Sequence, residues 1–309
     1  MRGATITGWG TALPPTVVTN ADFEARLDTT DAWITERSGI RERRMGGTTS
    51  GLAVEAARAA LDRAHLQADD VDLLVLATTT PDQQVPATSA VVQHELGLRC
   101  GAMDLNAACS GFVYGLVAAH GFTSMGFDRV LLVGSETLSR ITDQDDRATA
   151  VLFADGAGAV VLEAVPGDGQ LLGWDLGADG SAQPILNADI GAYIHMDGKE
   201  VFRRAVRATV SSAQAALAHA KVTAADIAVF VPHQANVRII ESAAQKIGIP
   251  MSKAAIVLDH TGNTSSASIP LALADAVDSG RVRDGDLVLL SGFGAGMTWA
   301  SAVLRWGAR

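Results

Sequence analysis

The chain has 309 residues, of which 48% are hydrophobic, and its formal net charge is −10 at pH 7. This length and apolar content allow a substantial core, built as one large α/β unit or as two fused domains. The negative charge argues against nucleic acid as the main partner, because phosphate binding needs a basic face. No apolar run is long enough to span a bilayer, and the first residues lack the apolar segment of a signal peptide, so we expect a cytoplasmic protein with no membrane partner.

In chain order, the first segment of chemical interest runs from residue 27 to 41. Thr30 and Asp31 are helix-start signals, and one tryptophan with closely spaced arginines follows them. An aromatic face beside guanidinium groups can stack an adenine and pair with its phosphates, although surface Trp and Arg are also common without such a role.

Beyond that segment, helices and strands alternate, which indicates an α/β sheet. The predicted helices cover about 52–65 and a segment that ends at Leu96, and a Pro-bearing loop covers 81–86. The predicted strands cover 71–79, 101–105, 130–136 and 157–162. We expect the strand at 101–105 to be buried, because it leads into a second apolar segment at 111–119 that is predicted to be a packed helix.

Cys109 lies at the junction between that strand and that helix. A thiol at a helix N-terminus sits in the positive end of the helix dipole, which lowers its pKa and favours the thiolate that attacks carbonyls. The position therefore suits a nucleophile, although most lone cysteines are small buried hydrophobic residues. The other cysteine, Cys100, is so close in sequence that the pair makes neither a disulfide framework nor a metal-ligand set, and we expect free thiols and no metal.

The second half of the chain repeats the pattern of the first. The predicted strand at 227–235 follows the one at Val71 by about 156 residues, and strand 255–258 with the loop at Asn263 follows Cys109 and its strand by about 154. The strand at 286–292 follows 128–134 by roughly 157. Three matching offsets in the same order indicate a duplicated domain, with turn-prone residues by coincidence as the alternative. Because corresponding strand ends of such duplicates converge, Cys109, His233 and Asn263 could meet.

Three of these segments, at Cys109, 231–236 and 260–270, resemble β-ketoacyl-acyl-carrier-protein synthase III, a family of the thiolase superfamily of condensing enzymes. The resemblance also covers the segments 33–41, 146–149, 153–159 and 292–299, so it runs nearly end to end. It implies a thiolase-like α/β/α/β/α five-layer fold made of two duplicated halves, 1–165 with the nucleophilic Cys and 166–309 with the catalytic His and Asn. It also implies a homodimer.

The chemistry of a decarboxylative Claisen condensation matches these residue types. A thiolate takes the acyl group from a thioester because it both attacks and leaves readily, and the resemblance gives Cys109 this role. Decarboxylation of a malonyl thioester then places negative charge on the thioester oxygen. Two donors aimed at that oxygen stabilise the enolate, and His233 and Asn263 are matched to this task, although a lone His or Asn is more often structural.

The Gly-rich run at 292–296 is incomplete as a dinucleotide-binding fingerprint. Small residues instead let the backbone approach a reacting carbonyl. By resemblance, the backbone N–H groups of Cys109 and Ala295 form the oxyanion hole. Family members commonly have glycine where this chain has Ala295, a change that should be tolerated because only the N–H is used.

The resemblance also implies the substrate contacts. Trp33, Arg37 and Arg147 are assigned to the nucleotide of coenzyme A, whose thioesters are substrates, and no permanently bound cofactor is expected. Val85 falls where the acyl pocket is closed from the partner subunit. An acidic enzyme needs a local basic patch to receive an acidic carrier protein, and the residues implied for this docking are Arg203, Arg238 and Lys246.

The expected function is β-ketoacyl-acyl-carrier-protein synthase III, which condenses an acyl-CoA primer with malonyl-acyl carrier protein to initiate fatty-acid or polyketide synthesis. An alternative is a related acyltransferase of a specialised pathway that moves the acyl group to another acceptor. A relative that uses a general base is disfavoured because Asn263 cannot abstract a proton, and a non-catalytic binding module is disfavoured by the intact set of Cys109, His233 and Asn263. The segment 180–195 looks shorter than in many family members, which leaves the choice of primer open.

Overall fold

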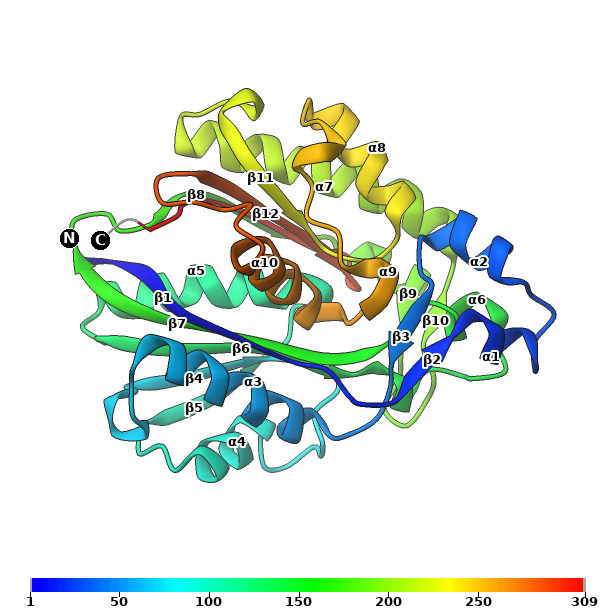
Figure 1. The fold of residues 1–309 in the computed structure, drawn as a ribbon, viewed down its shortest axis with the longest axis horizontal. Helices are drawn as coiled ribbons and strands as arrows, with labels where there is room; N and C mark the ends of the chain where they lie inside the picture. The colour runs from blue at the N-terminus through cyan, green and yellow to red at the C-terminus, as the bar shows by residue number, and fades with distance from the viewer. Residues whose placement is uncertain (1, 308–309) are drawn as a thin grey trace.

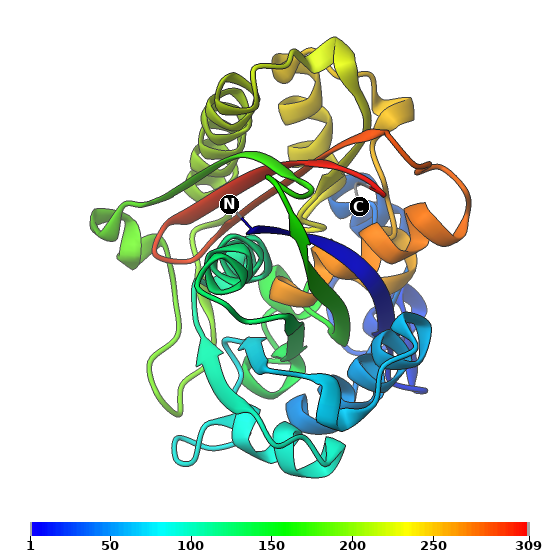
Figure 2. The same cartoon turned by 90° about the vertical axis from the view of Figure 1, so that its left-hand side faces the viewer.

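The computed structural model describes residues 2–307 and arranges them in five layers (Figure 1). Two sheets carry helices on their outer faces, and two further helices, α5 (Gly111–Ser124) and α10 (Ser268–Asp278), lie between the sheets. The turned view of Figure 2 shows the teal helix α5 between the two sheets. The expected α/β/α/β/α order of layers is therefore confirmed.

The first sheet has five strands and the second has four, each with a parallel and an antiparallel part. In spatial order, the first sheet consists of β1 (Arg2–Ala12), β7 (Asp155–Pro166), β6 (Arg129–Thr137), β4 (Leu73–Ala77) and β5 (Gly101–Leu105). In the same sense, the second consists of β8 (Leu171–Ala178), β13 (Thr298–Arg305), β12 (Leu287–Gly294) and β11 (Ile227–Pro232). Its outer helices are α7 (Gly198–Ala220) and α8 (Val237–Ile247), and those of the first sheet are α3 (Thr49–Ala64) and α4 (Thr88–Leu96).

Shorter elements connect these layers and build one end of the molecule, on the right in Figure 1. They comprise the strands β2 (Val17–Thr19), β3 (Glu42–Arg44), β9 (Leu186–Asn187) and β10 (His195–Met196), and the helices α1 (Asn20–Glu24), α2 (Asp31–Ser38), α6 (Arg147–Ala150) and α9 (Leu258–Thr261). The 3₁₀ turns are η1 (Ala68–Asp70), η2 (Ala108–Ser110), η3 (Leu138–Ile141), η4 (Gly180–Ile185), η5 (Ala224–Asp226), η6 (Met251–Lys253) and η7 (Ser265–Ala267).

The core lies between the sheets, around α5 and α10. A central parallel strand is buried on both faces, and β4, with the sequence LLVLA, is buried throughout. Helix α5 is apolar on most of its surface, as a helix between two sheets must be. One apolar cluster joins Leu132 of the first sheet and Leu290 of the second through Phe112 and Ile269 of these two helices. The two sheets therefore share a single core.

The order of strands supports the proposal of two duplicated halves. Strands β1, β7, β6 and β4 of the first sheet have the same arrangement as β8, β13, β12 and β11 of the second. The first set lies within residues 2–166 and the second within 171–305, so the division that we propose between 165 and 166 falls one residue before the end of β7.

Two strand predictions were wrong in detail. Strand β5 has the predicted bounds but is not buried, because it forms the uncovered edge of the first sheet. The segment 255–258 is not a strand, and the only bridge near it within residues 2–307 joins Phe230 to the preceding residue, Ala254. Its backbone is paired instead with the side chain of Gln234, which donates to the carbonyl of Ala255 and accepts from the N–H of Val257.

Candidate active site

Two cavities meet at Cys109. The first, of about 530 Å³, is lined by all three residues of the predicted catalytic set, Cys109, His233 and Asn263. The second, of about 390 Å³, lies against Cys109 and Ala295. The structure thus brings Cys109 together with side chains that lie more than 120 residues later in the sequence. A substrate that reaches Cys109 through one cavity can place its acyl group in the other.

Cys109 stands on a tight turn between β5 and α5. The turn forms because the Oδ1 of Asn106 accepts the N–H of Ala108 at 3.1 Å, while Ala108 adopts a left-handed backbone with φ of 49°. Such a conformation is uncommon for a residue with a Cβ atom. It lifts the half-buried Cys109 to the mouth of both cavities, directly before the helix.

Asn263 stands on a turn of the same construction. Its Oδ1 accepts the N–H of Ser265 at 3.0 Å, and Ser265 has a left-handed φ of 47°. Because 157 residues separate Asn106 from Asn263 and also Ala108 from Ser265, the two turns are equivalent in the two halves. The predicted offset of about 154 paired the correct two loops, but it is three residues smaller than the offset of 157 between equivalent residues. Since Oδ1 is occupied, the amide NH₂ of Asn263 is the group left to face the first cavity.

The first half of the chain also holds Asn263 in place. The N–H of Asn263 donates to the carbonyl of Leu152, and its own carbonyl accepts the N–H of Ala154, both at 2.9 Å. These two hydrogen bonds form an isolated parallel bridge between Phe153 and Asn263. Within residues 2–307, it is the only such bridge that connects a loop of the first sheet to a loop of the second. The amide of a residue from one half is therefore positioned by the backbone of the other.

His233 follows β11 and is buried. Its N–H donates to the carbonyl of Ser291 at 2.8 Å, its Nδ1 lies 2.6 Å from the Oγ of Ser268, and its ring meets Phe293 edge-on at 5.3 Å. Burial lowers the pKa of His233 to about 3. The imidazole is therefore neutral at physiological pH, and it can donate one hydrogen bond without carrying charge.

The acidity of Cys109 differs from the prediction. Burial raises the pKa of the thiol to about 12, whereas the helix N-terminus was expected to lower it. The nearby Ser265 hydroxyl opposes this rise in the pKa of the thiol, and the carboxyl of Glu136 adds to it. The thiol is thus the resting form, and the proton must leave as the sulfur attacks.

Glu136, at the end of β6, is fully buried and links the two halves beneath Cys109. Its oxygens accept from the backbone and hydroxyl groups of Thr79 and Thr80 at 2.7 to 3.1 Å, and from the hydroxyl of Ser266 at 2.9 Å. Ser266 lies in the turn that carries Asn263. Buried carboxyl groups need such partners, and here the partners come from both sides of the site.

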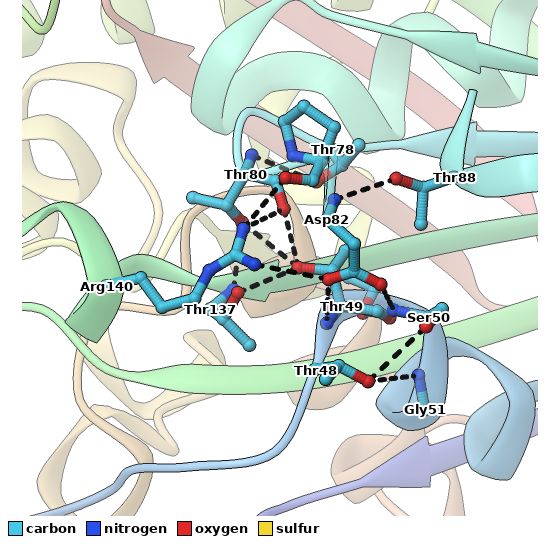
Figure 3. A network of polar contacts seen from close by, with 12 residues as sticks. Thr48, Thr49, Ser50, Gly51, Thr78, Thr80, Asp82, Thr88, Thr137 and Arg140 are labelled. Atoms are coloured by element: carbon cyan, nitrogen blue, oxygen red, sulfur yellow. Dashed lines mark hydrogen bonds and ion pairs between the residues drawn. The ribbon is translucent and has the colours of Figure 1, made fainter. Parts of the chain in front are cut away.

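A neighbouring polar network anchors the loop that carries Val85. Figure 3 shows Asp82 beside Arg140: the carboxylate accepts the N–H groups of Thr49 and Ser50 at 2.9 Å, and Arg140 donates to Asp82 and to the carbonyl of Thr80. Val85 itself is 83% exposed and lines neither cavity of this chain. Within one chain, Val85 therefore does not contribute to the acyl pocket, and the predicted role requires that it contact a second chain.

The three residues implied for coenzyme A lie together at the entrance of the first cavity. The guanidinium carbons of Arg37 and Arg147 lie 5.6 and 5.0 Å from the centroid of the Trp33 ring. Trp33 and Arg37 line the cavity, and Arg147 is held beside it by the carbonyl of Asp28 at 2.7 Å. Thr30 caps the helix that carries Trp33, as predicted, by accepting the Trp33 N–H.

The residues implied for carrier docking are less closely grouped. Arg238 lines the first cavity and lies over the ring of Phe202 at 5.8 Å. Arg203 is exposed but is paired with Glu200. Lys246 lies eight residues after Arg238 on α8, which is about 12 Å along the helix. Of these three residues, Arg238 is therefore the one that lines the first cavity.

The two amides implied for the oxyanion hole are kept together by Thr298. Its hydroxyl lies 2.8 Å from the carbonyl oxygen of Ala107 and 3.2 Å from that of Ala295. This single side chain therefore ties the turn of Cys109 to the loop of Ala295, which lines the second cavity.

Sequence reasoning missed the residues that support the three reactive ones. For four of them, the only indication in the sequence was that they lie in segments that resemble the family, because the identity of a serine or a phenylalanine does not show which neighbour it contacts. They are Thr298, Phe293, Ser265, Ser268 and, outside those segments, Glu136. The first cavity is also lined by Leu186, which lies in the segment 180–195 discussed above, and by Met196 and Lys199, which the sequence did not predict.

Comparison with known proteins gives a consistent result. The family model described as 3-oxoacyl-[acyl-carrier-protein (ACP)] synthase III matches residues 103–180, and the model of its C-terminal part matches 217–306. A β-ketoacyl-[acyl-carrier-protein] synthase III 1 from Bacillus anthracis is 46% identical over 307 residues, which cover 98% of both chains.

Solved structures agree. The 3-oxoacyl-[acyl-carrier-protein] synthase III from Aquifex aeolicus VF5 has a TM-score of 0.96 and 43% identity, covering 98% of this chain and 100% of that chain. The priming β-ketosynthase from the R1128 polyketide biosynthetic pathway has a TM-score of 0.94 and 36% identity, covering 99% and 97%.

Proposed function

The chain belongs to the β-ketoacyl-[acyl-carrier-protein] synthase III family, and we propose that its reaction is carried by Cys109, His233 and Asn263. As a member, it is an acyl-transferring condensing enzyme with a thiolase-like fold that initiates fatty-acid synthesis. The observation that supports the assignment of residues is their convergence on one cavity of about 530 Å³. The substrates are an acyl-CoA primer and malonyl-acyl carrier protein.

Acylation is the first step. The sulfur of Cys109 attacks the thioester carbonyl of acyl-CoA, the new C–S bond forms, and the thiol of coenzyme A leaves with the proton that Cys109 loses. The backbone N–H groups of Cys109 and Ala295 donate to the oxygen that becomes negative in the tetrahedral intermediate. One such donor typically lowers the activation free energy by about 3 to 4 kcal/mol.

Condensation is the second step. The malonyl carboxylate leaves as CO₂, and the electron pair of the broken C–C bond moves into the thioester, whose oxygen becomes an enolate. The neutral His233 and the amide NH₂ of Asn263 donate to that oxygen. The enolate carbon attacks the acyl-Cys109 carbonyl, the C–S bond breaks, and Cys109 regains a proton as β-ketoacyl-acyl carrier protein forms.

The two cavities divide the substrates between them. Trp33, Arg37 and Arg147 bind the nucleotide of coenzyme A at the entrance, and the pantetheine arm follows the first cavity to Cys109. The acyl chain enters the second cavity. Arg238 receives the acidic carrier protein at the same entrance, with Arg203 and Lys246 at the periphery, because opposite charge steers such encounters.

We expect the enzyme to act as a cytoplasmic homodimer. The outer edge of β5 pairs with no other strand of residues 2–307, and an unpaired edge is a ready site for a second copy. A dimer could also bring Val85 of one subunit to the acyl cavity of its partner. No helix in the described part of the chain combines the length and the apolar character that a membrane span requires.

A second function, priming of a polyketide pathway, is favoured by the similarity to the R1128 priming β-ketosynthase. The chemistry at Cys109 would be the same, and the pathway would differ through the primer and the carrier. The alternative mechanism is transfer of the acyl group from Cys109 to an acceptor other than malonyl-acyl carrier protein.

Intact protein mass tests the proposal. Wild type and Cys109→Ala are incubated with a panel of acyl-CoAs, and malonyl-acyl carrier protein is then added. We expect a mass increase equal to the acyl group in wild type only, followed by its discharge as β-ketoacyl carrier product. Acylation that persists until another acceptor is supplied would assign acyl transfer, and acylation of Cys109→Ala would contradict the role of Cys109.

A further inference from the structure

We propose that Ser268 is a positioning residue whose hydroxyl holds His233 in the tautomer that carries its proton on Nε2. The inference rests on the proposed role of His233 as a donor to the enolate. An imidazole can play that role only if the N–H is on the nitrogen that faces the substrate.

The geometry around Ser268 determines the direction of its hydrogen bond. The Ser268 Oγ is fully buried and lies 2.6 Å from Nδ1 of His233. The same oxygen accepts the backbone N–H of Gln234 at 3.3 Å. No carbonyl or carboxylate of residues 2–307 accepts the hydroxyl hydrogen, so Nδ1 is its only acceptor.

The tautomer follows from this count of donors and acceptors. If Nδ1 carried the proton, the Ser268 oxygen would accept from two N–H groups and its own hydrogen would be buried without a partner, which is costly. If Nε2 carries the proton, the Ser268 hydroxyl donates to Nδ1, and both the hydroxyl and Nδ1 are paired. Because burial lowers the pKa of His233 to about 3, the ring holds one proton at neutral pH and that proton resides on Nε2.

Nε2 is directed at the substrate. It has no hydrogen-bond partner in the described part of the chain. It is also not completely buried, because it is not one of the fully buried polar atoms that lack a partner. His233 lines the cavity that also contains Cys109 and Asn263. Phe293 packs edge-on against the ring and limits its rotation. Ser268 and Phe293 together therefore aim a single N–H at the position of the enolate oxygen.

A second buried histidine provides an internal reference. Nδ1 of His120 lies 2.9 Å from the carbonyl of Leu116, which can only accept, so the neutral ring of His120 carries its proton on Nδ1. Burial also lowers the pKa of His120. The chain thus contains two neutral buried histidines with opposite tautomers, and ¹⁵N chemical shifts of the ring nitrogens distinguish them.

The test combines NMR with kinetics on Ser268→Ala, Ser268→Thr and a control, Ser212→Ala. Ser212 is buried in α7, and its hydroxyl has no hydrogen-bond partner among residues 2–307, so its removal should change neither readout. In wild type and in the control we expect protonated Nε2 in His233 and protonated Nδ1 in His120 at pH 7.5. In Ser268→Ala we expect a mixture of tautomers at His233 alone.

The kinetic readout separates positioning from general damage. In Ser268→Ala we expect kcat for condensation to fall about 10- to 100-fold, while KM for malonyl-acyl carrier protein and the rate of Cys109 acylation stay within about twofold. Ser268→Thr keeps the hydroxyl and should restore most of kcat. Condensation within twofold of wild type in a folded Ser268→Ala, or a proton on Nδ1 of His233 in wild type, would overturn the proposal.

One comparison distinguishes this failure from failure of the proposed function. If His233→Ala condenses normally, the role of His233 is wrong whatever its tautomer. If His233→Ala loses condensation but Ser268→Ala does not, the function stands and the assignment of Ser268 falls.

Discussion

Gly294 lies directly against the backbone of Cys109. A Cβ atom at position 294 would be 2.5 Å from the amide nitrogen of Cys109 and 2.8 Å from the Cβ of Ala108. Real Cβ atoms do not approach backbone so closely. The end of β12 therefore sets the position of the nucleophile and of the amide that serves the oxyanion hole, and only glycine leaves the room for it.

Gly294→Ala should displace the Cys109 turn. We expect the rate of Cys109 acylation to fall at least about tenfold, since small shifts of a reacting group cost much of the rate. Gly180→Ala is the matched control, because a Cβ there meets nothing within 4 Å. Acylation rate by mass spectrometry and thermal unfolding are measured on both. Equal acylation by both variants would show that the turn accommodates the methyl group.

Ser265→Ala should make the Cys109 thiol less acidic. The Ser265 hydroxyl lowers the thiol pKa against the effect of burial. We expect alkylation by iodoacetamide to be slower than in wild type at every pH from 7 to 9.5, with a rate that still rises at the upper end, as a pKa of about 12 requires. A plateau near pH 7 in wild type, or superimposable profiles for the two proteins, would contradict this account.

Asn263→Asp should stop condensation and spare acylation. The change keeps the oxygen that accepts from Ser265 but replaces the free NH₂ with a carboxylate oxygen, which repels an enolate. We expect condensation to fall at least about 100-fold. The matched control is Asn106→Asp, which has the same turn in the other half and should fall less than about fivefold. Equal losses in both variants would indicate that the turn, and not the amide donor, matters.

Trp33→Leu should weaken the binding of acyl-CoA without slowing the chemistry. The centroid of the ring lies 5.6 Å from the guanidinium carbon of Arg37 and 5.0 Å from that of Arg147. We expect KM for acyl-CoA to rise about 10-fold with kcat within twofold, as for an interaction that is the same in ground and transition states. A short N-acetylcysteamine thioester, which lacks the nucleotide, serves as control substrate and should be unaffected.

Stability should fall as the solution becomes acidic. The pKa of His233 is lowered to about 3 and that of His120 is also lowered, whereas both are about 6.5 in an unfolded chain. Below pH 6.5 the unfolded state therefore binds protons that the native state does not, and each histidine reduces the free energy of unfolding by up to about 1.4 kcal/mol per pH unit.

Urea unfolding at pH 7.5, 6.5, 5.5 and 5.0 measures this effect. We expect a constant contribution above pH 6.5 and a loss that grows as the pH falls toward the native pKa values. His120→Gln should show a shallower decline than wild type over pH 6.5 to 5.0. Parallel curves for the two proteins would mean that His120 does not contribute.

The order of the layers and the residues that meet at the first cavity could be predicted because they depend on short segments. Small apolar residues after Cys109 predict the helix behind it, and the segments around His233 and Asn263 resemble a family in which those side chains act together. Thr30 as a cap of the helix of Trp33 could also be predicted, because capping depends on a few adjacent residues.

What could not be predicted depends on contacts between distant segments. The pKa of Cys109 is set by burial between two sheets, which the helix terminus alone does not reveal. The prediction of a strand at 255–258 was wrong because the side chain of Gln234, more than 20 residues earlier, forms hydrogen bonds with the backbone of this segment. The exposure of β5 follows from its place at a sheet edge, which its own composition does not indicate.

The equivalent turns at Asn106 and Asn263 also have a historical meaning. If a single ancestral half once paired with a copy of itself, both copies held the same turn, related by a twofold axis. In the present chain the sulfur occupies the fourth residue of one turn, and Ser266 holds that place in the other. The free amide acts from the first residue of the second turn. With the roles proposed above, fusion into one chain would have let two identical loops diverge into a nucleophile and an electrostatic partner, a difference that a symmetric pair does not permit.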